Sequence, residues 1–371
     1  MAKRVYIGVD GTARRVKKIF VGVDGVARRV KKAYIGIGGV ARPCFGSSEI
    51  AYYGQITSLS AGRSQLAATP TWNHALFGGG SDGSGSYHKT VDAYSRTLTR
   101  TTATTLSEGR LWLSATTVEY SALFGGGYNG SYSKVIDAYD TSLMRTNSTL
   151  SVARAYLAST SVGNYALFGG GNSDGSQAYA TVDAYNKSLT RTTPTELSVA
   201  RTQLSATTIG DYALFGGGGG VNSGQELTVD AYNKSLTRTT PTELSVARKA
   251  LSATTVGKYA LFGGGSSPVL AAVDAYDTSL TRTIPTPLSV ARSNLSATTI
   301  CDYDLFGGGM YASAVVDAYD TSLTRTTPTP LSEARMYLSA TSIGNYALFG
   351  GGHDGSWNVY YSTVDAYTIV N

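Results

Sequence analysis

The sequence contains few of the residues that cross-link a small protein or anchor it in a membrane. Its 371 residues include only two cysteines, Cys44 and Cys301, which excludes a dense disulfide framework and favours free thiols over one mutual disulfide. No apolar run approaches the roughly 18 residues of a membrane span, and the basic N-terminus lacks the apolar core of a signal peptide. We therefore expect no membrane span, no secretory signal and assembly in the cytoplasm.

Charged residues are also scarce, at 15% of the chain, and they are unevenly distributed. Residues 1–45 hold 11 of the 31 basic side chains but only two acidic ones, a net charge of +9, which leaves the rest at −3. This divides the chain into a basic arm, residues 1–45, and a nearly neutral body, residues 46–371. A hydrophobic content of 42% with 26 tyrosines argues against disorder, and 44 glycines argue against a long-helix protein.

Seven repeats make up the body. Phe-Gly-Gly-Gly recurs at intervals of 43 to 47 residues, always 14 residues after an arginine and always before an Asp-Ala-Tyr motif. The motifs begin at Phe77, Phe124, Phe168, Phe215, Phe262, Phe306 and Phe349; at Arg63, Arg110, Arg154, Arg201, Arg248, Arg292 and Arg335; and at Asp92, Asp137, Asp183, Asp230, Asp274, Asp317 and Asp365. Groups repeated in every copy are expected to be structural, not catalytic.

Each repeat contains signals for four short strands. Two lie between the arginine and the phenylalanine, around a turn such as Gly210–Asp211, a third carries Asp-Ala-Tyr, and a Leu-Thr-Arg-Thr segment is the fourth. Four strands per roughly 45 residues, without helical periodicity, predict an all-β fold, a seven-bladed β-propeller. The chain ends after the third strand of the last copy, so a strand near residues 51–58 is expected to complete that blade.

Over about residues 50–371, the arginine, the hydrophobic hairpin ending in a glycine pair and the third-strand tyrosine resemble the kelch repeat. The resemblance implies a kelch-like propeller. Kelch blades usually carry a tryptophan on the fourth strand, and we expect leucine to take that place here, at Leu98, Leu143, Leu189, Leu236, Leu280 and Leu323.

The basic arm repeats every 14 residues. Asp10–Gly11, Asp24–Gly25 and Gly38–Gly39 stand between apolar residues, which predicts β-hairpins joined as a meander. Its basic clusters favour docking on an acidic protein surface or plain solvated strand faces; nucleic acid is disfavoured because aromatic residues are sparse. The predicted docking residues are Arg14, Arg15, Lys17, Lys18, Arg28, Arg29, Lys31 and Lys32.

The arm is also similar to short basic repeats in proteins encoded by phages or prophages of Gram-positive bacteria. That resemblance covers only the arm. It implies a virion or phage-tail-like particle in which several copies of the chain attach to other virion or tail proteins.

Catalytic patterns are absent from the sequence. His74, His88 and His353 are scattered and are expected on the surface or in loops, and no spacing predicts a metal or cofactor site. The acidic residues of the variable segments, Asp82, Asp174, Glu226 and Asp354, belong to separate repeats, and near-identical repeats are expected to give no asymmetric pocket. We therefore expect no enzyme.

The loop between Phe-Gly-Gly-Gly and Asp-Ala-Tyr is the one that varies in length: the distance from its phenylalanine to its aspartate runs from 11 to 16 residues. In an antiparallel blade these loops converge on one face, where aromatic and small polar residues suit recognition of a cell-surface glycan or receptor. A purely structural decoration or collar protein, or a polysaccharide-acting enzyme, are the alternatives. The candidate ligand-binding residues are Tyr87, His88, Tyr128, Tyr132, Tyr179, Tyr311, Trp357, Tyr360 and Tyr361.

Overall fold

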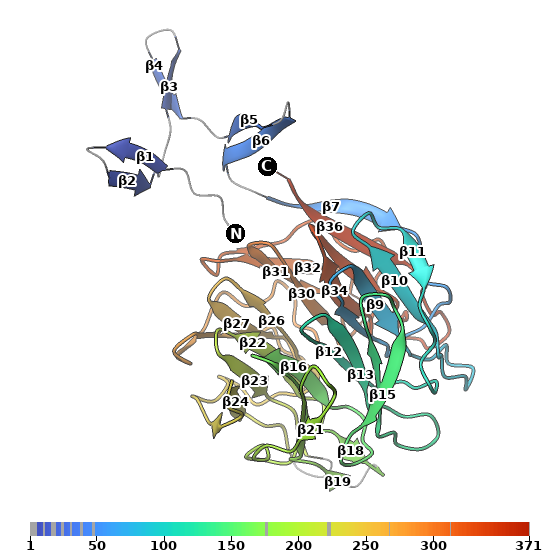
Figure 1. Ribbon diagram of the computed structural model, residues 1–371. Coiled ribbons are helices and arrows are strands. Elements are labelled where there is room, and N and C mark those ends of the chain that lie inside the picture. Colours follow the sequence, from blue (N-terminus) through green and yellow to red (C-terminus); the bar gives the residue numbers. More distant parts are fainter. Residues whose placement is uncertain are drawn as a thin grey trace.

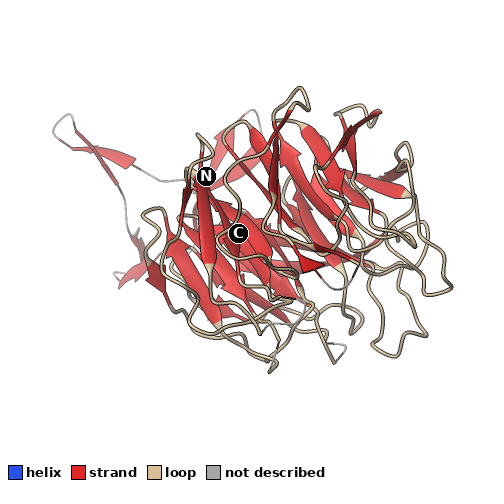
Figure 2. Cartoon of the chain, turned by 90° about the horizontal axis from the view of Figure 1, so that it is seen from below, coloured by secondary structure: helices blue, strands red, loops and turns tan. Residues whose placement is uncertain are grey.

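The computed structural model describes residues 49–370 except 175–176, 221–223, 267 and 312, together with the backbone of six strands between residues 6 and 46. Strands and loops make up all of the described residues, which contain no helix (Figure 2). It follows that none of these residues belongs to a helix able to cross a membrane.

Seven four-stranded antiparallel sheets form the blades. Blades 1 to 3 are β8 (Ala67–Pro70), β9 (His74–Gly78), β10 (Val91–Ser95), β11 (Arg100–Thr102); β12 (Ser114–Val118), β13 (Ser121–Gly125), β14 (Val135–Tyr139), β15 (Arg145–Thr149); and β16 (Ala158–Val162), β17 (Tyr165–Gly169), β20 (Val182–Tyr185), β21 (Arg191–Thr192). Blades 4 and 5 are β22 (Ser205–Ile209), β23 (Tyr212–Gly216), β24 (Val229–Asn233), β25 (Arg238–Thr239); and β26 (Ser252–Val256), β27 (Tyr259–Gly263), β28 (Val273–Asp277), β29 (Arg282–Thr283). Blades 6 and 7 are β30 (Ser296–Ile300), β31 (Tyr303–Gly307), β32 (Val316–Asp320), β33 (Arg325–Thr326); and β34 (Ser339–Ile343), β35 (Tyr346–Gly350), β36 (Val364–Val370), β7 (Glu49–Ile56).

A strand from the N-terminal side closes the ring. In Figure 1, β7, in light blue, lies beside β36, in red; the two pair antiparallel from Glu49↔Val370 to Ile56↔Val364. The first strand of each blade contacts the first strand of its neighbours, including β34 with β8. The predicted all-β seven-bladed propeller is confirmed.

The blades divide the disc into two faces. We call the face that carries the linkers between blades and the loops after the glycine triplets the loop face. The opposite face, with the tight turns between first and second strands and between third and fourth strands, is the turn face. Because β7 runs from the turn face to the loop face, Glu49, where the chain enters the propeller, lies at the turn face.

Hydrophobic packing occurs mainly between blades. The cluster between blades 1 and 2, for example, joins Leu76 and Val91 of one blade to Phe124 and Tyr139 of the next. Glycine is required there, since a Cβ on Gly78 would lie 2.8 Å from the Phe124 ring. Close blade contact thus explains the first glycine of each triplet.

The repeated arginines and aspartates form buried ion pairs within each blade. Arg63 Nη2 lies 2.7 Å from Asp92 Oδ2, and the other six pairs are 2.7–2.8 Å apart, all with fully buried side chains. Each arginine also donates to the carbonyl of the motif phenylalanine, as Arg63 does to Phe77 at 3.2 Å. This network fixes the linker against the second and third strands and is structural, as expected.

The six repeated leucines are not on the fourth strand, so that expectation was wrong. They occupy the turn between the third and fourth strands, with φ between 57° and 63°. In blade 2, Asp140 Oδ1 accepts hydrogen bonds from the backbone of Ser142 and Met144, which tightens the turn around Leu143. Leu143 then packs against the hydrophobic cluster between blades.

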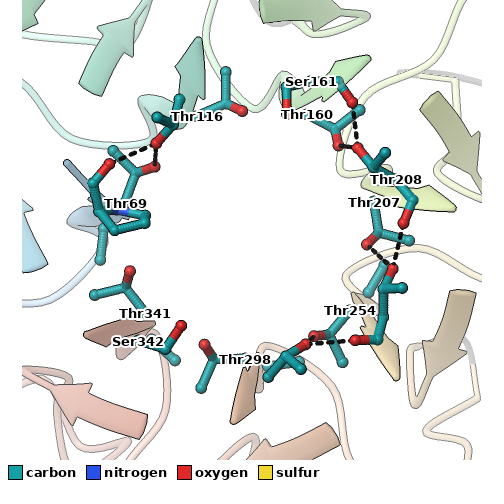
Figure 3. Close-up of a pocket in the computed structure, with 18 residues that line it drawn as sticks. Thr69, Thr116, Thr160, Ser161, Thr207, Thr208, Thr254, Thr298, Thr341 and Ser342 are labelled. Carbon is teal, nitrogen blue, oxygen red and sulfur yellow. Dashed lines mark hydrogen bonds between the residues drawn. The ribbon is translucent and has the colours of Figure 1, made fainter. Parts of the chain in front are cut away.

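The central channel is lined by the first strands. Threonine hydroxyls join neighbouring blades at four of the seven boundaries: Thr69 with Thr117, Thr160 with Thr208, Thr207 with Thr255 and Thr254 with Thr299, at 2.7–2.9 Å (Figure 3). The channel encloses about 420 Å³. These hydroxyls therefore connect blades at the axis, where the sheets have no further strand to pair with.

The described parts of the arm are three hairpins: β1 (Tyr6–Val9) with β2 (Thr12–Arg15), β3 (Phe20–Val23) with β4 (Val26–Arg29), and β5 (Lys32–Ile37) with β6 (Val40–Gly46). They are separate two-stranded sheets and not the continuous meander that was expected. The predicted turn residues lie outside the described residues. A further small hairpin, β18 (Asn172–Ser173) with β19 (Gln177–Ala178), stands in the variable loop of blade 3.

Candidate functional site

The variable loops are fixed at their bases on the loop face. A backbone N–H late in each loop donates to the last glycine carbonyl of the triplet: His88 to Gly80 at 2.9 Å, Tyr179 to Gly171 at 2.8 Å, and Tyr361 to Gly352 at 2.9 Å. The loops are therefore supported by the blade, although their lengths differ. Their aromatic side chains gather in two groups.

The first aromatic group lies on blades 1 to 3. Tyr128 has its ring centroid 6.2 Å from that of Tyr87, 5.2 Å from Tyr132 and 5.9 Å from Trp112. Trp112 in turn stacks on Tyr156, with centroids 4.3 Å apart and planes at 25°. Three predicted residues, Tyr87, Tyr128 and Tyr132, thus meet two that sequence reasoning missed.

The second aromatic group lies on blade 7. His353 stacks on Trp357, with centroids 4.0 Å apart, and on Tyr337 at 5.5 Å, and the Tyr360 ring is 5.7 Å away. His353 is fully buried, not on the surface; its Nδ1 accepts a hydrogen bond from Gly355 N–H at 2.9 Å. Burial lowers the pKa of His353, so the imidazole is neutral at neutral pH and belongs to the aromatic group.

The two groups approach each other at the boundary between blades 7 and 1. Gly83, in the loop of blade 1, packs directly against Tyr360, whose ring a Cβ on Gly83 would overlap. In the same loop, His88 Nε2 lies 3.4 Å from Asp82 Oδ2, and burial lowers the pKa of His88. The aromatic surface therefore continues from blade 7 to blade 3 with one polar interruption.

The remaining predicted residues lie outside these groups. Tyr179 is half-buried, with its hydroxyl 2.8 Å from that of Ser173, and Tyr361 is half-buried near its loop base. Tyr311, on blade 6, is 81% exposed. The structure thus brings together predicted residues of blades 1, 2 and 7 and leaves Tyr179, Tyr311 and Tyr361 apart.

A cup lies at the axis on the loop face, where the first strands begin. It encloses about 210 Å³ and is lined by two residues from each blade. Trp112, Tyr156 and Tyr337 of the aromatic groups stand at its rim. The lining residues are Gln65, Leu66, Trp112, Leu113, Tyr156, Leu157, Gln203, Leu204, Ala250, Leu251, Asn294, Leu295, Tyr337 and Leu338.

This cup is asymmetric, so the expectation that near-identical repeats give no asymmetric pocket was wrong. The signal was present in the sequence: the second residue after each motif arginine, just before the first strand, differs in chemical type among the seven copies. It reads Gln65, Trp112, Tyr156, Gln203, Ala250, Asn294 and Tyr337.

A metal site on this face would need a group of ligand side chains. Among residues 49–370, excluding the gaps given above, no three His, Cys, Asp or Glu side chains are grouped so that they could hold a metal ion. The side chains of the predicted docking residues Arg14, Arg15, Lys17, Lys18, Arg28, Arg29, Lys31 and Lys32 lie outside the described residues. Cys301 is a free, exposed thiol at a turn of the turn face, and the side chain of Cys44 is not described.

Comparison with known proteins supports the fold alone. No protein-family model matches the chain, and no curated protein matches it. A solved structure of YjhT matches with a TM-score of 0.55 and 12% sequence identity, over 85% of this chain and 99% of that chain. At so low an identity this likeness establishes one thing: the chain is a seven-bladed, kelch-like β-propeller.

Proposed function

We propose that this chain is a binding component of a phage or phage-tail-like particle, in which the basic arm anchors the chain and the loop face of the propeller binds a cell-surface glycan. Aromatic rings offer apolar faces for sugar rings, and small polar loop residues offer hydrogen bonds to hydroxyls. The partners of residues 1–45 in this proposal are other virion or tail proteins, and the chain is present in several copies.

One observation carries the proposal: the arm joins the propeller at the face opposite the aromatic surface. Glu49 pairs with Val370 at the turn face, whereas Tyr87, Tyr128 and Trp357 lie on loops of the loop face. An anchor on one face leaves the other free for a ligand. A purely structural decoration would need no such separation.

A hydrolytic role has less support. Hydrolysis of a glycosidic bond by paired carboxyl groups needs one of them protonated, with a raised pKa. Asp82 and Asp354 both flank Tyr360, but a hydrogen bond from Ser84 lowers the pKa of Asp82, and one from Ser356 lowers the pKa of Asp354. Both are ionised at neutral pH, which fits hydrogen bonding to hydroxyls better than acid catalysis.

The experiment uses the full chain, labelled with a maleimide dye at Cys301 after Cys44→Ser, since Cys301 lies on the turn face away from the loops. Labelled protein is titrated onto Gram-positive cells and onto purified wall polysaccharides. Saturable binding that falls when Trp357→Ala and Tyr128→Ala are combined supports the proposal. Absence of binding to all cells and polysaccharides, with particle incorporation unaffected by neutralising the arm, refutes it.

A further inference from the structure

A closed ring of backbone hydrogen bonds surrounds the axis at the rim of the cup. The N–H of the second residue after each motif arginine donates to the carbonyl of its counterpart in the preceding blade, at 2.9–3.1 Å. Gln65 donates to Tyr337 and so closes the circle. The seven members, which we call the axial ring, are Gln65, Trp112, Tyr156, Gln203, Ala250, Asn294 and Tyr337.

Every member of the axial ring has a left-handed backbone. Their φ values lie between 52° and 58°, a region that disfavours every residue with a side chain except in special settings. Glycine would fit best, yet none of the seven positions carries it in a chain with 44 glycines. A side chain retained at such a position calls for a structural or a functional reason.

The repeat has a second position with a left-handed backbone, the turn leucine, and the role of that residue is structural. The turn leucines, such as Leu98 and Leu143, also have positive φ, but they are leucine in six blades and pack into the core. The axial ring instead holds five residue types, and its side chains line the cup. Packing therefore does not dictate which side chain stands there.

The chemistry of the cup is amphipathic and uncharged. Seven leucines, one from each blade, adjoin the ring, and none of the fourteen described lining residues carries a formal charge. Trp112, Tyr156 and Tyr337 supply aromatic faces, and Gln65, Gln203 and Asn294 supply amides that both donate and accept hydrogen bonds. Ala250 leaves one sector of the rim without a long side chain.

We propose that the axial ring is the specificity-determining rim of a pocket for one neutral sugar residue. The apolar face of the sugar stacks on an aromatic member of the ring, and the sugar hydroxyls form hydrogen bonds with the amide side chains of the ring. This rests on the proposed function and names its ligand class and subsite. The cup, at about 210 Å³, is smaller than the roughly 300–1,000 Å³ of pockets for drug-sized ligands, so it accepts one terminal sugar residue and not an oligosaccharide.

The test exploits the repeats, because each substitution places at one ring position a residue that another blade already holds with the same φ. Trp112→Gln and Tyr337→Gln copy blades 1 and 4, and Asn294→Ala copies blade 5, so all three are expected to fold. The matched control is Trp72→Gln, at a 57% exposed tryptophan on the turn face. Far-UV circular dichroism and the melting temperature verify folding of each variant.

The probes are free glucose, galactose, mannose, N-acetylglucosamine and N-acetylgalactosamine, with glucuronic acid as the charged comparison, titrated into the full chain and followed by tryptophan fluorescence and saturation-transfer NMR. We expect at least one neutral sugar to bind. Trp112→Gln and Tyr337→Gln should each weaken it about tenfold or more, Asn294→Ala should change the order of preference among the sugars, and Trp72→Gln should change neither.

The outcomes separate the two proposals. If cells or wall polysaccharides bind but the ring variants bind them as wild type does, the axial subsite is wrong while the proposed function stands. If glucuronic acid binds more tightly than every neutral sugar, the ligand class is wrong. If no glycan, cell or free sugar binds, the proposed function itself fails.

Discussion

Asp304 is a buried carboxyl group at a position where the six other blades have alanine: Ala75, Ala122, Ala166, Ala213, Ala260 and Ala347. Its Oδ1 accepts hydrogen bonds from the hydroxyls of Thr299 at 2.8 Å and Thr254 at 3.3 Å. Its Oδ2 is buried with no hydrogen-bond partner among the described residues. Burial raises the pKa of Asp304 well above its usual value. We predict that Asp304→Ala stabilises the propeller.

The magnitude follows from the hydrogen bonds that remain. Without Asp304, the Thr255 carbonyl at 2.7 Å can accept the single Thr299 hydroxyl hydrogen, and the Thr254 hydroxyl lies 2.7 Å from that of Thr299, so no new unsatisfied group is created. Removing a buried unsatisfied polar atom is worth about 1–3 kcal/mol. Since alanine already fits the six equivalent sites, we expect a melting temperature a few degrees higher at pH 7.

The pH dependence supplies the sharper test. Above about pH 4 the unfolded chain has lost the Asp304 proton, whereas the folded chain keeps it up to the raised pKa. Because the folded state then binds more protons, wild-type stability falls with rising pH, by up to about 1.4 kcal/mol per pH unit from this group. The advantage of Asp304→Ala should therefore be smallest near pH 4 and grow toward the raised pKa.

Thermal unfolding followed by circular dichroism at pH 4, 5.5 and 7 measures this difference. Asp304→Asn is the control that keeps the side-chain volume and removes the titration. A variant less stable than wild type at pH 7, or an advantage that does not change with pH, would refute the reasoning.

Three further predictions concern the threonine hydroxyls of the central channel, the buried ion pairs and the basic arm. Ser342→Thr keeps the hydroxyl and adds a methyl group that restricts χ1, so it should favour with Thr298 the contact that pairs threonines at four other boundaries, and should raise stability by about 0.5–1.5 kcal/mol in thermal unfolding. Arg201→Met removes the closer charge partner of the buried Asp230 carboxylate and leaves it only Arg238, at 3.3 Å, so it should cost about 3 kcal/mol, and a double variant with Asp230→Asn should recover part of it; an equal loss in both would contradict the pairing. Replacing the basic residues of 1–45 by glutamine should abolish particle incorporation, scored by sedimentation, without changing the propeller's melting temperature.

The regular parts of this fold can be predicted from the sequence because they repeat. Seven copies of Phe-Gly-Gly-Gly and Asp-Ala-Tyr at nearly constant spacing determine the number of blades, and the pairing of Arg63 with Asp92 recurs in every copy. Alternating strand directions then assign the variable loops to one face. Tyr87, Tyr128 and Trp357 follow from that assignment alone.

Features that depend on neighbours across the axis could not be predicted. The axial ring joins residues about 45 positions apart through backbone groups, and nothing local to Trp112 or Tyr156 indicates a positive φ. The resemblance to kelch blades predicts Leu98 on the fourth strand, but Leu98 lies in the turn before that strand, with φ of 62°. His353 is buried because Trp357 and Tyr337 enclose it, and that enclosure is a tertiary effect.

The pairing of β7 with β36 has a mechanical consequence under the proposed function, in which the arm anchors the chain at one face and a ligand binds at the other. Tension between a bound ligand on the loop face and the arm at Glu49 acts along β7, because that strand runs from one face to the other. Force in this direction shears the strand against β36 and loads the ladder from Glu49↔Val370 to Ile56↔Val364 in parallel, so the bonds do not open one at a time. The strand that closes the propeller therefore also carries the mechanical load between the arm and the loop face.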